Sequence, residues 1–78
     1  MSRPIHQIAS ETFRLWKNVH YTARPYLNAM LRLESITDNY GADSGRSVVL
    51  YFLSNANSWR GDDARRIKAE LRAILKQK

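Results

Sequence analysis

The stretch from Ser47 to Trp59 is the most apolar part of the chain, and in a protein of 78 residues it must contribute to any core. Residues 48–53 are rich in β-branched and aromatic side chains, which favours a buried strand. Apolar and polar residues do not alternate, however. Apolar side chains instead recur at the spacing of one helix face, at Val49, Phe52, Leu53, Ala56 and Trp59. Because Asp43 or Ser44 can cap such a helix, the pattern predicts a helix, with a buried strand as the alternative.

The N-terminal part of the chain carries a second helical pattern. Its apolar stripe consists of Ile5, Ile8, Thr12, Leu15, Trp16 and Val19. Pro4 lacks an N–H, which the first turn of a helix tolerates, so we expect this helix to begin at Ser2 or Arg3. Residues 18–24 are predicted to form a joint, because a residue that precedes a proline disfavours the helical conformation.

A third pattern begins at Thr22 or Pro25 and runs to Ile36. Its apolar residues cover a broad face, made of Tyr26, Leu27, Met30, Leu31, Leu33 and Ile36. A helix this apolar is either buried on two sides or takes part in self-association. Residues 37–44 follow as the longest predicted loop, since they contain turn-forming Asp, Asn and Gly residues.

The C-terminal helix has the clearest pattern. Gly61 or Asp62 is placed to cap it, and its two ends carry charges that match the helix dipole: Asp62 and Asp63 at the start, Lys76 and Lys78 at the end. The apolar stripe consists of Ala64, Ile67, Leu71, Ile74 and Leu75.

Charged residues on this helix divide into two sets. Asp62, Arg66 and Glu70 stand four residues apart and predict a salt-bridge ladder. The remaining cations are expected to be unpaired and to span an arc of about 80° beside the apolar stripe. They are Arg65, Lys68, Arg72 and Lys76, and they form the best candidate binding surface in the sequence.

Composition argues against several chemistries. The chain has no cysteine, which removes disulfides, thiol catalysis and Cys-based metal sites. His6 and His20 are far apart in sequence and no acid is arranged to complete a metal set. The acids stand at caps or singly on helix surfaces, so we expect no enzyme, no metal and no cofactor. No apolar run has membrane-spanning length and no signal peptide follows Met1, so we expect a cytoplasmic protein without membrane contact.

The net charge of +6 is distributed unevenly. Residues 60–78 hold seven Lys and Arg residues against three acids, whereas residues 37–59 hold one Arg and two Asp. Such a basic end favours an anionic partner, either a nucleic acid or an acidic protein. A recognition helix would enter a DNA groove by its N-terminus, where Asp62 and Asp63 would repel phosphates. Nucleic acid would therefore lie along the flank of the helix and little sequence would be read.

Protein binding is the other class of function. Trp59 and Arg60 stand at a helix junction, and Trp and Arg are the residue types that most often anchor interfaces. For Trp59, core packing is the favoured role and interface anchoring is the alternative. Apolar residues in excess of what so small a core must hide also favour a partner surface or a homodimer.

Three segments resemble a family of small bacteriophage proteins, found especially in phages of actinobacteria. The residues are Pro25-Tyr26-Leu27-x-Ala29-Met30, then Asp38-x-Tyr40-Gly41-x-Asp43-Ser44-x-Arg46-Ser47-Val48-x-x-Tyr51-Phe52-Leu53-Ser54-Asn55-Ala56, then Trp59-Arg60-Gly61-Asp62-x-Ala64-Arg65-x-Ile67-Lys68-x-Glu70-Leu71. The resemblance covers residues from about 4 to 76 and is one of overall pattern. It assigns no site residue, and implies an accessory protein that acts in the host cytoplasm.

We therefore expect a single all-α domain over residues 1–78, built from about four short helices with the third helix central. The predicted function is non-enzymatic binding of a host macromolecule, with a host protein as the first choice. Nucleic-acid binding by the basic stripe of the last helix is the alternative.

Overall fold

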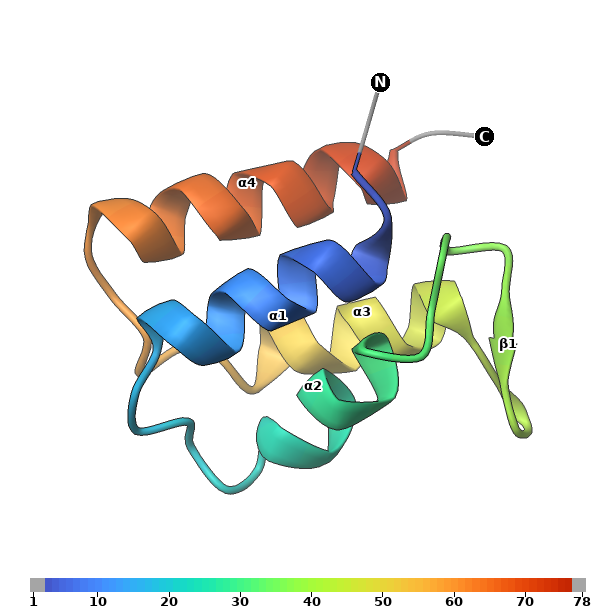
Figure 1. The fold of residues 1–78 in the computed structure, drawn as a ribbon, viewed down its shortest axis with the longest axis horizontal. Helices are drawn as coiled ribbons and strands as arrows, with labels where there is room; N and C mark the ends of the chain where they lie inside the picture. The colour runs from blue at the N-terminus through green and yellow to red at the C-terminus, as the bar shows by residue number, and fades with distance from the viewer. Residues whose placement is uncertain (1–2, 77–78) are drawn as a thin grey trace.

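The computed structural model describes residues 3–76, and its helices follow the order predicted from the sequence. The elements are α1 (Ile5–Leu15), α2 (Arg24–Met30), β1 (Asn39–Tyr40), β2 (Asp43–Ser44), α3 (Gly45–Ser54) and α4 (Asp62–Leu75). Both α1 and α3 pack against α2 and α4. Figure 1 shows α4 along the top and α2 along the bottom, with α1 and α3 between them. Ser2, one of the two predicted starts of the first helix, and Lys78 lie outside the described residues.

The apolar stretch around residues 48–53 is helical, so the strand alternative was wrong. The cap of α3 is Ser44, whose Oγ accepts a hydrogen bond from the Ser47 N–H at 3.1 Å. The face that α3 buries includes Val48, Val49 and Phe52. The predicted stripe continues past the end of the helix, because Ala56 and Trp59 are buried in the connection to α4.

The third helix was predicted to be central with the other helices packed on it, and α3 does contact α2, α4 and both strands. One face of α3 is open to solvent, with Leu50 47% exposed and Tyr51 49% exposed. The first helix packs mainly against α2 and α4 instead of gathering around α3. The four helices thus share one core, and each keeps a solvent-facing side.

The second helix is shorter than predicted, since α2 ends at Met30 and not at Ile36. Two carbonyls in the segment beyond the end of α2 accept hydrogen bonds from the start of α1. The Ile5 N–H donates to Glu34 O at 3.0 Å, and the His6 N–H donates to Leu33 O at 2.9 Å. N–H groups at a helix start have no partner inside their own helix. The segment after α2 therefore caps α1.

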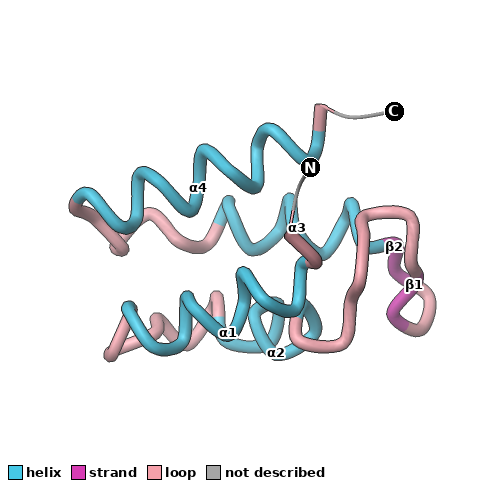
Figure 2. The backbone as a smooth tube through the Cα atoms, turned by 45° about the horizontal axis from the view of Figure 1, so that its top comes forward, coloured by secondary structure: helices cyan, strands magenta, loops and turns pink. Residues whose placement is uncertain are grey.

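A short hairpin precedes α3, so the fold is not purely all-α (Figure 2). Its strands β1 and β2 are antiparallel, with Asn39 opposite Ser44 and Tyr40 opposite Asp43. Gly41 in the turn has a φ of 62°, which glycine adopts without steric strain. Strands of two residues are too short to show alternation, which is why the sequence indicated only a loop here.

The two tryptophans meet in the core. Trp16 stacks on Trp59 with ring centroids 5.4 Å apart and an angle of 7° between the planes, and Phe52 meets Trp16 nearly edge-on. Trp16 directly follows α1 and Trp59 lies just before α4. The stack therefore fixes the end of α1 against the connection that leads into α4.

Candidate functional site

The C-terminal helix α4 begins where the sequence predicts, but it ends at Leu75, so Lys76 is its C-cap and does not lie in the last turn as predicted. Gly61 is its N-cap with a φ of 110°, a backbone conformation that favours glycine. The buried stripe consists of Ala64, Ile67, Leu71 and Ile74. Charged residues lie on both flanks of this stripe. The two flanks differ in whether their cations pair with carboxylates of neighbouring elements.

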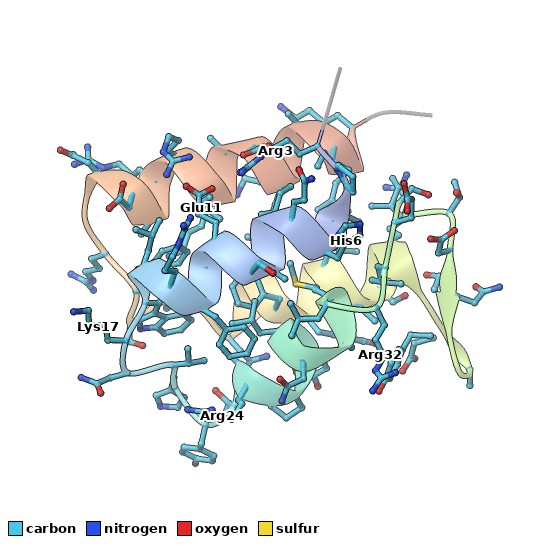
Figure 3. The ribbon with its side chains drawn as sticks, viewed as in Figure 1. Arg3, His6, Glu11, Lys17, Arg24 and Arg32 are labelled. Atoms are coloured by element: carbon cyan, nitrogen blue, oxygen red, sulfur yellow. The ribbon has the colours of Figure 1, made fainter. Side chains whose placement is uncertain are left out.

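On the flank that faces α1, cations and carboxylates neutralise one another, and Figure 3 shows Arg3 and Glu11 between the two helices. Arg3 donates to both carboxylate oxygens of Glu70, at 2.9 and 2.7 Å, and its Nη1 lies 2.8 Å from Glu11 Oε1. Arg66 donates to the other oxygen of Glu11 at 2.9 Å. The hydrogen bond from Arg66, followed by the one from Arg3, holds the pKa of Glu11 below its ordinary value.

The predicted ladder along α4 was wrong. Arg66 pairs with Glu11 and approaches Asp63 at 3.6 Å, whereas Glu70 pairs with Arg3. The neighbouring helix offers a partly buried carboxylate, and pairs shielded from water are less screened than an exposed pair along one helix. Arg3 and Arg66 thus tie the N-terminal segment and α1 to α4. We call Arg3, Glu11, Arg66 and Glu70 the paired cluster.

On the other flank, the four predicted cations share one side of α4. Arg65, Arg72 and Lys76 are exposed and Lys68 is half-buried. Arg60, which was predicted with Trp59 as an interface anchor, joins Arg65 and Lys68 around one hollow in the turn before α4. We call these five residues the basic surface: Arg60, Arg65, Lys68, Arg72 and Lys76.

The expectation that Arg65 is unpaired was wrong. Its Nη2 lies 3.0 Å from Asp62 Oδ1, one turn earlier on the same helix. The two side chains are 81% and 99% exposed. An ion pair this open to water contributes little and exchanges readily for another anion. Arg65 therefore stays accessible to a ligand.

Lys68 is the most enclosed cation of the basic surface. Its Nζ donates to the backbone carbonyl of Trp59 at 2.7 Å, which also makes it less free than predicted. Burial, and then the positive charges of Arg72 and Arg60, lower the pKa of Lys68 from its ordinary value. Lys68 is therefore close enough to be repelled both by Arg60 in the turn and by Arg72 farther along α4.

The hollow itself has a volume of about 400 Å³. It lies where the turn of Asn57 to Gly61 meets the first two turns of α4, and Trp59 forms part of its wall. Three of its lining side chains are the cations Arg60, Arg65 and Lys68, and none of its lining residues carries a carboxylate.

Trp59 does not fit the alternative role of an exposed interface anchor. Its side chain is 6% exposed and stacked on Trp16, so core packing, the favoured role, describes it correctly. Two residues near the basic surface were missed. Asn57 lines the hollow, and Arg46 donates to the Leu75 carbonyl at 2.7 Å, beside Lys76. No local pattern in the sequence marks either one, because the packing of α3 against α4 brings them there.

Other features of the described chain give weaker indications of a functional site. Tyr26 and Tyr51 have ring centroids 5.4 Å apart on the α2 and α3 side, next to the exposed Leu50. Within residues 3–76, no group of three or more His, Asp or Glu side chains could hold a metal ion. None of the helices in this part of the chain has the length and apolar character needed to cross a membrane.

The charge arrangement at α4 is thus the chemical feature that most distinguishes the molecule. Comparisons with protein-family models, curated proteins and solved structures found no match to the chain.

Proposed function

We propose that the basic surface of α4 binds the sugar-phosphate backbone of nucleic acid. The observation that supports this most is the accumulation of Arg60, Arg65, Lys68, Arg72 and Lys76 on one side of the molecule. In residues 3–76, the carboxylate that pairs with one of these cations is the fully exposed Asp62. The sequence favoured a protein partner first, and the burial of Trp59 removes a main reason for that order.

The binding mode follows from where the acids lie. Asp62 and Asp63 occupy the first turn of α4, so this end of the helix would be repelled from a groove lined by phosphates. Arg72 and Lys76 lie two and three turns farther along. The flank of α4 is therefore proposed to follow the backbone, where contacts fix the position of the protein and carry no sequence information.

Fluorescence anisotropy with a labelled duplex tests this proposal. Neutralising about four phosphates gives a slope of about −3.6 in log K against log salt, which is a loss of about 100-fold between 50 and 200 mM salt. Duplexes of different sequence should bind alike. Absence of binding at low salt would overturn the proposal.

Matched double variants make the test specific. Arg65→Ala with Arg72→Ala should weaken binding by about 60-fold in 0.1 M salt, since each phosphate contact is worth about eightfold there. Arg24→Ala with Arg32→Ala removes the same charge from exposed residues near α2, which Figure 3 labels away from α4. Equal losses in both variants would mean that net charge alone attracts the duplex.

A protein partner is the second candidate, favoured by the exposed side chains of Leu50 and Tyr51 on α3. In that case, as the resemblance to small phage proteins implies, the protein would act on a host component. The same side chains could instead contact a second copy of the chain, and sedimentation equilibrium tests this self-association. A dimer that dissociates in Leu50→Ser with Tyr51→Ser supports this candidate, and a monomer at all concentrations excludes self-association through α3.

A further inference from the structure

The hollow beside the start of α4 combines enclosure with a single sign of charge. Arg60, Arg65 and Lys68 line it, together with the polar side chain of Asn57. The nearest carboxylate partner, Asp62, pairs with Arg65 but does not line the hollow. A volume of about 400 Å³ gives ample room for a small anion and its bound water.

The cations around the hollow repel one another. Lys68 is partly withdrawn from water and is repelled by Arg72 and Arg60. Its Nζ has three donors, of which one is used by the Trp59 carbonyl. An anion in the hollow would accept from the remaining donors and turn repulsion between cations into attraction to a shared charge.

We propose that this hollow binds a phosphomonoester group, held by the guanidinium groups of Arg60 and Arg65 and the ammonium group of Lys68. The inference deepens the proposed function and rests on it, because it identifies the group as a terminal phosphate of a nucleic-acid strand. A phosphomonoester carries between one and two negative charges at neutral pH and projects from the strand end. An internal phosphodiester carries one charge and lies along the strand, so it suits the open flank near Arg72 better.

Formation of the complex requires few changes. The Arg65–Asp62 pair is exposed on both sides, so Arg65 can turn toward the ligand with little loss. Arginine offers paired N–H donors to two phosphate oxygens, and Lys68 adds a point charge that the Trp59 carbonyl already orients.

Inorganic phosphate is the first probe. Amide chemical shifts of the protein should change saturably around residues 57–65 and at Lys68 when phosphate replaces chloride at constant ionic strength. Arg60→Gln with Lys68→Gln should raise the dissociation constant by about tenfold or more, the effect of losing charge-assisted hydrogen bonds. Arg24→Gln with Arg32→Gln is the matched control and should leave it unchanged. The inference would be overturned if chloride caused the same amide shift changes as phosphate. It would also be overturned if the changes did not saturate with phosphate concentration.

The single variant Arg60→Gln guards against a folding defect, because this side chain is exposed and its loss leaves the Lys68 hydrogen bond intact. It should weaken phosphate binding while the circular dichroism spectrum stays that of the native protein. Unchanged phosphate binding in a folded Arg60→Gln protein would contradict the assigned geometry.

Two oligonucleotides then identify the source of the phosphate. A 5′-phosphorylated strand should bind about tenfold more tightly than the same strand with a 5′-hydroxyl, and the difference should vanish in Arg60→Gln with Lys68→Gln. Equal affinity of the two strands overturns this inference, and salt-dependent duplex binding would then leave the proposed function standing. Saturable phosphate binding without any duplex binding would instead reject the proposed function and keep the anion site.

Discussion

The two flanks of α4 use their cations in opposite ways. Toward α1, Arg3 and Arg66 are bound to Glu70 and Glu11, so their charges hold elements together. On the basic surface, Lys68 is held by a backbone carbonyl and Arg65 by an exposed carboxylate. The difference teaches that a cation becomes available for a ligand when the neighbouring element offers it no buried carboxylate, and that charge counts alone do not reveal this.

Charge reversal on the basic surface should have the largest effect. Arg72→Glu with Lys76→Glu replaces two attractions to phosphate by two repulsions, so duplex affinity in 0.1 M salt should fall by well over about 60-fold. Thermal stability should change little, because both side chains are exposed. Anisotropy and a thermal melt measure the two quantities. Retained affinity would mean that the duplex does not contact this flank.

Removing a member of the paired cluster should lower stability more than it lowers duplex affinity. Arg3→Ala should lower the free energy of unfolding by about 1 kcal/mol, a value kept small because the ion pairs are partly exposed. Duplex affinity should change much less than in the charge-reversed protein. Urea unfolding measures the loss, with Arg14→Ala, an exposed arginine on α1, as the control. If Arg3→Ala affected binding more than stability, the paired cluster would also act in binding and the two flanks would not differ in role.

Acid should weaken the paired cluster. The folded state holds the pKa of Glu11 below the ordinary value of about 4.5, so the unfolded chain binds more protons in that range. The stabilisation is therefore present above the ordinary value and is lost as the pH falls through the lower folded-state pKa. In urea unfolding at several pH values, Glu11→Gln should lose stability near neutral pH and show a flatter decline in acid. A decline as steep as that of the original chain would assign the acid sensitivity to other carboxylates.

At alkaline pH, the free energy of unfolding should depend on Lys68 of the basic surface, and this is the smallest of the expected effects. The pKa of Lys68 is lowered in the folded state, so the folded protein releases this proton before the unfolded chain does. Stability should therefore rise slightly as the pH increases from the folded-state pKa toward the ordinary value of 10.5. Lys68→Met keeps the aliphatic part of the side chain and should abolish this rise in unfolding experiments. A rise that survives in Lys68→Met would originate elsewhere.

The sequence predicted best the features set by local periodicity. The limits of α4 follow from an apolar stripe, a glycine cap and two aspartates in the first turn, all within one segment. The helical state of residues 48–53 was also readable, since the spacing of its apolar residues outweighed their β-propensity. Helical periodicity also placed Arg65, Lys68, Arg72 and Lys76 on one side of α4, whereas Arg60 precedes the helix and was predicted with Trp59 as an interface anchor.

Features set by contacts between distant segments were not predictable from one sequence. The helix α2 ends at Met30 and carbonyls of the segment beyond it serve α1, a contact between distant segments that nothing near Met30 signals. The partners of Arg66 and Glu70 come from α1 and the N-terminal segment, so the local ladder was the natural and mistaken expectation. Core packing of Trp59 was favoured from the sequence, but its stacking partner Trp16, from a distant segment, was not predicted.

The most direct test of this account compares one arginine from each flank. The slope of log duplex affinity against log salt should become shallower by about 1 in Arg72→Gln, because one phosphate contact is lost. In Arg66→Gln the slope should stay that of the original chain, while the melting temperature falls because Glu11 loses a hydrogen bond. If both variants change the slope equally, the two flanks do not differ as binding surfaces and the central claim is wrong.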